Sequence, residues 1–326
     1  MDIKIGILGA GRWGMNHVRT AVGLVGEKNT LVCESDEMQQ EKVRQIGKDI
    51  KVTGDFGVFL NSDVNAVINA LPAEMHFETT KMCLEAGKNV LVEKPMTLLS
   101  KESEELTKIA EVRNLKLMVG HILLYHPAVI KLKKLIDEGK IGKLQYIYSN
   151  RLNLGAIRSE ENILWSFAPH DISILQYIIG SKPLRVEAMG SSFVQKGIED
   201  TTLTYLVYPN GVAAHIFVSW LHPFKEQRLV VTGDKGMFVF EDSLKTEKLK
   251  FYGKGFRVVN GTPEKFDSDY EVICFDEAKP LEEEQKHFIN CILNNTQPLT
   301  DGRHAVEVLK ILEKATESML NVKCKM

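Results

Sequence analysis

The sequence predicts an α/β protein of two domains: a doubly wound parallel sheet, followed by an α+β domain with a large, open and mostly antiparallel sheet. Continuous apolar runs alternate with helix-like segments as far as residue 121, which is typical of a parallel sheet covered on both faces. Alternating, β-rich segments dominate after residue 143. A chain of 326 residues is also longer than a domain with a single hydrophobic core usually is. We therefore expect domains at 1–121 and 122–326.

Composition excludes several classes of protein. The 41 basic and 43 acidic residues leave a net charge of −2, so no overall field attracts nucleic acid or an anionic membrane. The five cysteines form no CxxC pair, and no histidines have metal-ligand spacing. No apolar run reaches the roughly 18 residues of a membrane span, and no charged leader precedes one. We expect a cytoplasmic protein with reduced thiols and no metal.

The segment "IKIGILGAGRWGMNHVRTAV" (3–22) predicts a dinucleotide site, because its GxGxxG lies between a strand pattern and a helix pattern. Gly9 makes the tight turn, Gly11 lets the backbone approach a pyrophosphate, and Gly14 allows close packing of the helix on the strand. Arg12 and Trp13 complete the loop. The pyrophosphate would lie at the helix N-terminus, where the backbone N–H groups favour anions.

The next strand, in "NTLVCESD" (29–36), favours NAD over NADP. Glu34 follows Gly14 by about twenty residues, where this fold places the acid that binds the ribose hydroxyls. A carboxylate there repels a 2′-phosphate. Asp36 is the competing candidate for this acid, and a surface carboxylate at a strand end is the less favoured interpretation of Glu34. Because of Arg12, NADP remains the alternative, less favoured cofactor.

Two further strands, "DVNAVINALP" (63–72) and "NVLVEKP" (89–95), end in residues that we expect at the cofactor. Ligands of doubly wound sheets bind beyond the carboxyl ends of the strands. The candidates at these ends are Leu71, Pro72, His76, Glu93 and Lys94. Burying a lysine costs several kcal/mol unless it finds a partner or loses its proton. We therefore place Lys94 at the rim, where nicotinamide and substrate meet.

In the second half, "NILWSFAPHDISILQYIIG" (162–180) predicts a helix that begins near Pro169 and ends at Gly180. The helix dipole would then keep His170 neutral, the form that a general base needs. Asp171 fits a first-turn acid better than a catalytic one, and a histidine beside Trp165 can also be structural. Two helices near the C-terminus, in 282–293 and 301–320, are expected to pack on this domain.

Four motifs together resemble the glucose-fructose oxidoreductase and inositol dehydrogenase family (Gfo/Idh/MocA): GxGxxG, "EKP" (93–95), "GHILLYHPA" (120–128) and "APHDIS" (168–173). The resemblance spans essentially the whole chain. It implies a Rossmann domain that binds NAD(P) and a second domain that supplies the substrate wall and the oligomer interface. It also implies that Lys94 is the active-site lysine and His170 the catalytic histidine. Ser166 stands where the family often has an aspartate.

Within the family, the segments around 150–175 and 196–237 are most similar to the UDP-N-acetylglucosamine 3-dehydrogenase branch. That similarity implies a UDP-hexosamine substrate oxidised at C3. A diphosphate needs cations, and Arg228 is one that could face the cleft, although ordinary surface charge explains such residues equally well. Trp220 could stack on the substrate or pack in the core. The candidate substrate residues are Arg151, Arg158, Trp165, Trp220, His222 and Lys225.

The expected reaction passes hydride from the sugar carbon to NAD. His170 takes the hydroxyl proton and cationic Lys94 stabilises the developing alkoxide, or Lys94 itself is the base. A dehydrogenase of inositol or a free sugar is the alternative enzyme, and a non-catalytic NAD-binding regulator is the alternative from another class. The uncovered sheet face predicts a homodimer or homotetramer.

Overall fold

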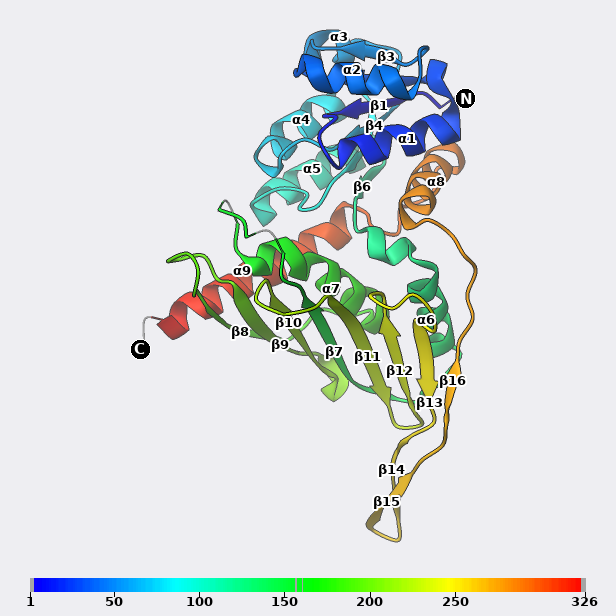
Figure 1. The fold of residues 1–326 in the computed structure, drawn as a ribbon, viewed down its shortest axis with the longest axis vertical. Coiled ribbons are helices and arrows are strands. Elements are labelled where there is room, and N and C mark those ends of the chain that lie inside the picture. Colours follow the sequence, from blue (N-terminus) through cyan, green and yellow to red (C-terminus); the bar gives the residue numbers. More distant parts are fainter. Residues whose placement is uncertain (1–2, 156, 160, 324–326) are drawn as a thin grey trace. The chain divides into compact units, whose positions relative to one another are not determined.

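The computed structural model describes residues 3–155, 157–159 and 161–323 (Figure 1). The chain divides into two compact units. Unit 1 comprises Met1–Tyr125 and Ala278–Leu309, and unit 2 comprises His126–Glu277 and Lys310–Met326. Each unit contains its own sheet, and the long helix α9 (Gly302–Lys323) contributes to both.

Unit 1 is built on a parallel sheet of six strands in the order β3-β2-β1-β4-β5-β6. This is the order of a dinucleotide-binding fold, with the switch point between β1 and β4. The strands β1, β4 and β6 are completely buried, which explains their continuous apolar sequences. The strands are β1 (Ile5–Leu8), β2 (Thr30–Cys33), β3 (Lys51–Thr53), β4 (Ala66–Asn69), β5 (Asn89–Val92) and β6 (Leu117–Val119).

Helices connect these strands in the alternation that the sequence predicts. The helices are α1 (Gly14–Val25), α2 (Glu37–Ile46), α3 (Phe56–Leu60), α4 (Ala73–Glu85) and α5 (Ser100–Val112), with 3₁₀ turns η1 (Glu27–Asn29) and η2 (Ile122–Tyr125). The side chain of Asp36 accepts hydrogen bonds from the N–H groups of Met38 and Gln39. Asp36 therefore caps α2, which separates its role from that of Glu34.

Helix α8 (Pro280–Asn294) belongs to unit 1, where it packs against α1 and η2. The prediction that both C-terminal helices pack on the second domain is therefore wrong for α8. The first unit ends close to the expected boundary at residue 121, but the segment 278–309 returns to it. The apolar stripe of α8 predicts that one face is buried, and it carries no information about which sheet the helix covers.

Unit 2 is built on a sheet of eight strands in the order β16-β13-β12-β11-β7-β10-β9-β8. Among the described strands of this sheet, only the β7–β10 pair is parallel, so the predicted large and mostly antiparallel sheet is confirmed. The strands are β7 (Leu144–Leu152), β8 (Arg185–Ser191), β9 (Thr201–Val207), β10 (Ala213–Ser219), β11 (Glu226–Gly233), β12 (Met237–Glu241), β13 (Leu249–Tyr252) and β16 (Tyr270–Val272). The turn η3 (Pro209–Gly211) joins β9 to β10, as predicted.

One face of this sheet is covered by α6 (Pro127–Asp137) and α7 (Ile163–Ile179). The predicted start of α7 near Pro169 is wrong, because the helix begins six residues earlier. Asn162 caps it by accepting a hydrogen bond from the N–H of Trp165, and Pro169 lies inside the helix. Most of this segment is buried, so tertiary packing outweighs the hydrogen bond that the proline cannot donate.

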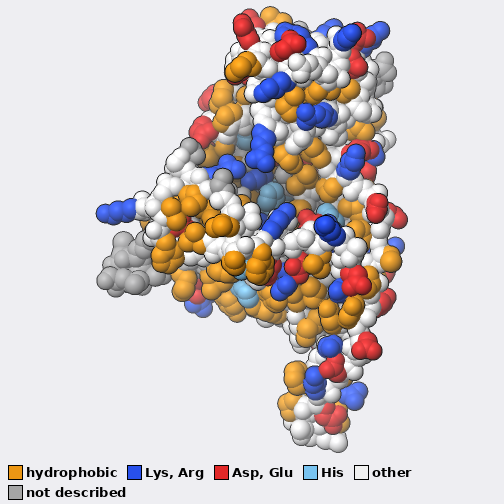
Figure 2. Space-filling view, in the orientation of Figure 1, with side chains coloured by type: hydrophobic (Ala, Val, Ile, Leu, Met, Phe, Trp, Pro, Cys, Tyr) orange, Lys and Arg blue, Asp and Glu red, His pale blue; other side chains and the backbone are white. Residues whose placement is uncertain are grey.

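A two-stranded hairpin, β14 (Gly255–Val259) and β15 (Thr262–Phe266), extends from the edge of the large sheet (Figure 1). Figure 2 shows charges of both signs along it at the lower end of the view. Lys254 and Lys265 both pair with Asp267. A lone hairpin is marginally stable in water, and the Lys254–Asp267 pair joins the residue before β14 to the residue after β15.

The described cysteines are free thiols: Cys33, Cys83, Cys274 and Cys291. Cys324 lies outside the described residues. Burial raises the pKa of the Cys33 thiol to about 11, so this thiol stays protonated and unreactive near neutrality. Within 3–155, 157–159 and 161–323, no helix has the length and apolar character needed to cross a bilayer.

Candidate active site

The loop after β1 has the shape that a pyrophosphate requires. Gly9 adopts a φ of +83°, a conformation that side chains rarely allow. A Cβ atom on Gly14 would lie 2.1 Å from the carbonyl oxygen of Gly9, so only glycine lets α1 approach the strand this closely. A Cβ on Gly11 would meet nothing within 4 Å. Gly11 therefore faces open space, where a ligand can approach the backbone.

Glu34, directly after β2, is tied to this loop. One carboxylate oxygen accepts a hydrogen bond from the N–H of Ala10 at 2.6 Å, and the other accepts from the N–H of Asp36 at 2.9 Å. Each oxygen keeps a lone pair that can accept from a ribose hydroxyl. Of the two acids considered from the sequence, Glu34 is therefore the one that fits the ribose position.

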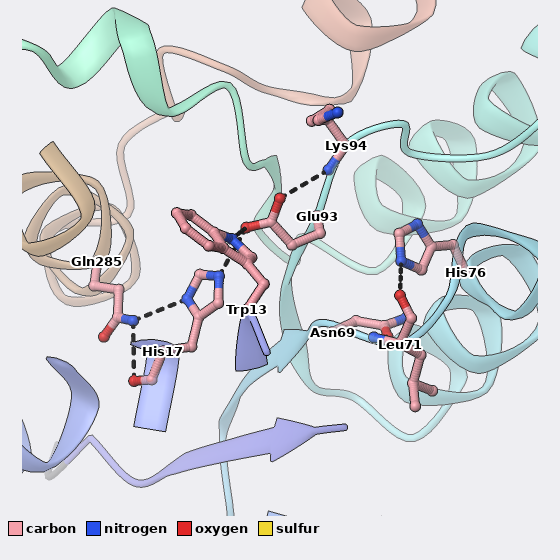
Figure 3. A network of polar contacts seen from close by, with 8 residues as sticks. All are labelled: Trp13, His17, Asn69, Leu71, His76, Glu93, Lys94 and Gln285. Atoms are coloured by element: carbon pink, nitrogen blue, oxygen red, sulfur yellow. Dashed lines mark hydrogen bonds and ion pairs between the residues drawn. The ribbon is translucent and has the colours of Figure 1, made fainter. Parts of the chain in front are cut away.

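The end of β4 is held by side chains that are themselves buried. Asn69 donates to the hydroxyls of Thr79 and Thr80 on α4. The ring nitrogens of His76 lie 2.8 Å from the carbonyl oxygens of Leu71 and Pro95. This buried ring therefore links the end of β4 to the "EKP" turn, and its polar atoms are already used. Figure 3 shows the contact with the Leu71 carbonyl. We expect His76 to position the site and not to touch the cofactor directly.

A second network centres on Glu93, directly after β5 (Figure 3). One of its oxygens accepts from Trp13 Nε1 at 2.6 Å and lies 2.7 Å from His17 Nε2. The other accepts from the N–H of Lys94 at 3.2 Å. The amide of Gln285, on α8, donates to His17 Nδ1 and to the His17 carbonyl. This arrangement assigns the imidazole proton to Nε2, which donates it to Glu93.

The charge on Glu93 is stabilised despite its burial. Burial acts to raise the pKa of Glu93, but hydrogen bonds from His17 and Trp13 and the charge of Lys94 outweigh it. The net pKa is lowered, so Glu93 is a carboxylate near neutrality. Trp13 lies in the glycine loop and remains 43% exposed. Glu93 therefore connects the cofactor loop to the turn that carries Lys94.

His121 is a further residue at this edge. Val92 of β5 pairs with Val119 of β6, so Lys94 and His121 each lie two residues beyond a matched pair of strand residues. His121 is buried, and neither ring nitrogen has a hydrogen-bond partner in the part of the chain that the structure describes. Burial, with His304 and Lys94 adding to it, holds the pKa of His121 well below its usual range. His121 is therefore a neutral imidazole.

In unit 2, Arg151 has a structural partner. Its guanidinium makes two hydrogen bonds to Asp171, at 2.8 and 3.0 Å, and Ser149 donates to the same carboxylate. Both charged side chains are buried between β7 and α7. The expected roles of Arg151 in substrate binding and of Asp171 as a first-turn acid are therefore replaced by a buried ion pair.

The other candidate substrate residues divide by burial. Trp220 is 1% exposed, in the core of unit 2, which favours the packing interpretation. Trp165 donates from Nε1 to Thr316 at 3.0 Å. Arg228 pairs with Glu226 and Glu241 on the sheet. Arg158, His222 and Lys225 lie in loops that retain exposure, with Arg158 paired to Glu161.

His170 is the eighth residue of α7 and is half-buried. The dipole argument for its neutrality no longer applies, because the helix N-terminus lies two turns earlier. Ser166 lies one turn before it on the same helix, where i and i+4 side chains share a face. The assignment of His170 therefore depends on the resemblance and on the side chains around it.

Sequence reasoning missed the buried polar residues behind the rim, which are His17, Asn69, His121, Glu284 and Gln285. His17 was visible as a polar residue one turn after Gly14 on the buried face of α1. Gln285 and Glu284 gave no such signal, because Gln285 meets His17 across 268 residues of sequence.

The six-stranded order, the glycine loop and the acid after β2 define a dinucleotide-dependent oxidoreductase fold. Residues 3–121 match the "Oxidoreductase family, NAD-binding Rossmann fold", and residues 129–239 match the "GFO/IDH/MocA C-terminal domain". The chain belongs to the GFO/IDH/MocA family of oxidoreductases. It is thus an enzyme of the dehydrogenase type, and its cofactor is NAD.

Similar proteins cover nearly the whole chain. The chain is 27% identical to the scyllo-inositol 2-dehydrogenase (NAD(+)) of Bacillus subtilis, over 98% of this chain and 95% of that protein. It is 25% identical to the UDP-N-acetylglucosamine 3-dehydrogenase of Acidithiobacillus ferrooxidans, over 93% and 92%. A solved structure of the latter enzyme superposes with a TM-score of 0.84 at 22% identity, covering 98% of both chains. A levoglucosan dehydrogenase complex with NADH gives 0.83 at 18%, with the same coverage; these two superpositions show the fold.

The residues present fit NAD. The first turn of α1 has no acidic residue and no side-chain cap, so its N–H groups can bind a pyrophosphate. Bound NAD supplies the hydride acceptor of the reaction. The chain contributes the glycine loop, the Glu34 carboxylate and the Glu93–Trp13 contact that fixes the loop.

Proposed function

We propose that the protein oxidises a sugar hydroxyl by hydride transfer to NAD, and that its substrate is a UDP-sugar, UDP-N-acetylglucosamine, oxidised at C3. The observation that carries this proposal is the match to the UDP-N-acetylglucosamine 3-dehydrogenase of A. ferrooxidans along 93% of the chain. Lys94 at the carboxyl edge of the parallel sheet supports the chemistry, because a cation there can stabilise a developing alkoxide. The product would be a 3-keto sugar for amino-sugar or polysaccharide synthesis.

In the proposed mechanism, His170 removes the hydroxyl proton and Lys94 stabilises the alkoxide. The alternative assignment makes Lys94 the base. The Glu93 carboxylate supports the first assignment, because a negative neighbour favours the charged form of a lysine. His121 is neutral and adds no second positive charge beside Lys94.

Contacts to a UDP group are proposed for Arg158, His222 and Lys225, which keep exposure in the loops of unit 2. His222 is held by the carbonyl of Phe224. Arg151 is not proposed, because Asp171 occupies its guanidinium. A diphosphate site would therefore be built from loop cations and not from the sheet.

The first experiment measures NADH formation by absorbance with NAD and four substrates: UDP-N-acetylglucosamine, its uronic acid, free N-acetylglucosamine and myo-inositol. Each assay is run with and without an aminotransferase that removes the keto product. We expect turnover with a UDP-sugar only. Turnover with free sugars alone would reject the UDP assignment. No NADH formation with any of the substrates would favour a non-catalytic NAD-binding regulator.

Single substitutions test the catalytic pair. We expect Lys94→Ala and His170→Ala each to lower kcat by at least about a hundredfold, with the NAD dissociation constant changed little. Arg158→Ala should raise KM for the UDP-sugar and leave kcat nearly unchanged. Full activity of the Lys94 or His170 variant would refute the assignment of that residue.

A second candidate function is oxidation of an inositol, favoured by the 27% identity to the scyllo-inositol 2-dehydrogenase. An inositol dehydrogenase would need the residues at the carboxyl edge of the parallel sheet of unit 1, such as Lys94, and no diphosphate site. Substitution of Arg158 or Lys225 would then leave KM unchanged. The same substrate panel separates the two candidates.

We also propose that the large sheet mediates a homodimer or homotetramer. Helices α6 and α7 cover one face. The other face presents Met189, Leu203 and Tyr205, which are 59%, 40% and 43% exposed. Neighbouring strands β8 and β9 place these apolar side chains together, and a patch of this kind marks an association surface.

Finally, we propose a cytoplasmic location. The four described cysteines are free thiols, which is typical of a reducing compartment. Cell fractionation of the tagged protein would check this assignment.

A further inference from the structure

A cavity of about 280 Å³ lies within unit 1, apart from the glycine loop. It is lined by the C-terminal end of α5, by the start of β6 and by residues between 297 and 303, which lead into α9. The sheet is parallel, so the start of β6 lies at the opposite edge from Lys94, which follows the carboxyl end of β5. The cavity is therefore separate from the candidate active site.

Lys116 lines this cavity and is only 6% exposed. Its backbone N–H donates to the side chain of Asn89, and its carbonyl accepts from the N–H of Val90, so its backbone groups are directed towards β5. Within the described residues, the ammonium group of Lys116 makes no hydrogen bond and no ion pair. A buried charge without a partner is unfavourable. Lys116 therefore lacks the negative partner that its burial requires.

The other charged residues of the cavity are already compensated. Arg303 on α9 donates from Nε to Glu111 on α5 at 2.6 Å. Asp301 accepts from the N–H of His304 at 2.9 Å, and the positive end of α9 offsets its negative charge. Among the described residues that line the cavity, Lys116 is thus the one whose charge is left without compensation.

Two amide side chains add hydrogen-bond donors to this lysine. Asn114 and Gln297 line the cavity, and neither side chain bonds another group in the part of the chain that the structure describes. An amide NH₂ group donates two hydrogen bonds, so these residues can bind the same anion as Lys116. The cavity is close to the lower limit for ligand pockets, about 300 Å³. Its ligand is therefore small.

We propose that this cavity binds a small carboxylate, with the ammonium group of Lys116 as its main partner. A carboxylate carries one negative charge, which matches the single uncompensated charge of the lining. A phosphate group carries about −1.5 to −2 near neutrality, and its excess charge would be repelled by Glu111 and Asp301. The carboxylate contacts α5, β6 and the start of α9 together, so it stabilises the return of the chain to unit 1. This inference is independent of the proposed substrate.

The experiment titrates the full-length protein, saturated with NAD, with acetate, lactate, succinate or inorganic phosphate. Sodium chloride keeps the ionic strength constant, and bound NAD keeps anions out of the pyrophosphate site. Relaxation of the ligand signals measures binding, by proton NMR for the carboxylates and by phosphorus NMR for phosphate. We expect saturable binding of at least one carboxylate and weaker binding of phosphate.

Lys116→Met removes the charge and keeps an unbranched side chain. We expect it to raise the dissociation constant of the carboxylate at least about tenfold, because a hydrogen bond to a charged group is lost, while NAD affinity is unchanged. Lys108→Met is the matched control, since Lys108 is exposed on α5 and outside the cavity; it should bind the carboxylate as the wild type does.

If Lys116→Met fails to fold, Gln297→Ala provides the second variant, because Gln297 is exposed. It should also weaken carboxylate binding, by a smaller factor. Equal binding by the wild type and by the folded cavity variant would show that the carboxylate binds elsewhere and would overturn the proposal. Tighter binding of phosphate than of every carboxylate, or no saturable binding of any anion, would overturn it as well.

Discussion

Two glycines of the loop after β1 differ in what an added methyl group would meet, and this separates their roles. A Cβ on Gly14 would lie 2.1 Å from the Gly9 carbonyl oxygen, so Gly14→Ala must displace α1 from β1. We expect the free energy of unfolding to fall by about 1–3 kcal/mol, measured by urea denaturation.

Gly11→Ala should behave differently, because a Cβ there meets nothing within 4 Å. We expect its unfolding curve to match the wild type and its NAD dissociation constant to rise about tenfold or more, or about 1.4 kcal/mol. A loss of stability as large as that of Gly14→Ala would mean that Gly11 serves the loop and not the cofactor.

The buried ion pair of unit 2 makes the next prediction. Asp171→Asn leaves the Arg151 guanidinium buried without its counter-charge, which costs about 3–5 kcal/mol. Glu187→Gln is the control, since the Arg185–Glu187 pair is exposed and should contribute under about 1 kcal/mol. Thermal unfolding compares the two variants, and similar melting temperatures would contradict the structural role of Asp171.

At the scale of elements, α7 illustrates what the sequence could predict. The left-handed Gly180 ends the helix as predicted, because a C-terminal glycine is a local signal. The start was misplaced because a proline in a helix interior is tolerated only when packing compensates for it. Here the residues before Pro169, such as Ile163 and Leu164, are buried, and burial of this kind depends on strands far away in sequence.

Helix α8 gives a prediction about stability and pH. Burial raises the folded pKa of Glu284 above its unfolded value of about 4.5, so the folded state binds more protons. The contribution of Glu284 to stability is therefore fully present below about pH 4.5 and declines as pH rises towards the folded pKa, by up to about 1.4 kcal/mol per pH unit. Glu284→Gln removes this decline, and its advantage over the wild type should grow with pH.

Urea unfolding at a series of pH values measures the effect. Glu283→Gln should give a curve parallel to the wild type, because Glu283 lies at the surface. Parallel curves for Glu284→Gln and the wild type would show that Glu284 is ionised in the folded protein.

At the scale of the whole molecule, the sequence could predict the site residues at the strand ends and not the buried residues that hold them in place. Glu34 and Lys94 follow strands directly, so strand ends and spacing locate them. The contact between His17 and Gln285 exists only because the chain returns to unit 1 after building unit 2. No periodicity encodes that return, since an amphipathic helix fits any apolar surface of suitable shape.

The open face of the large sheet provides the test of assembly. Strand β9 directs Leu203 and Tyr205 to the face that α6 and α7 leave uncovered, and Leu203 pairs with Met189 across the strands. Leu203→Asp places a charge in that apolar patch, and desolvating it in an interface costs several kcal/mol. We expect light scattering after size exclusion to show a smaller assembly for this variant. Leu184→Asp is the control, because Leu184 is 74% exposed and lies one residue before β8. The alternation of side chains along the strand directs it to the opposite face from Met189. An unchanged assembly for Leu203→Asp, or equal effects of both substitutions, would show that copies associate elsewhere.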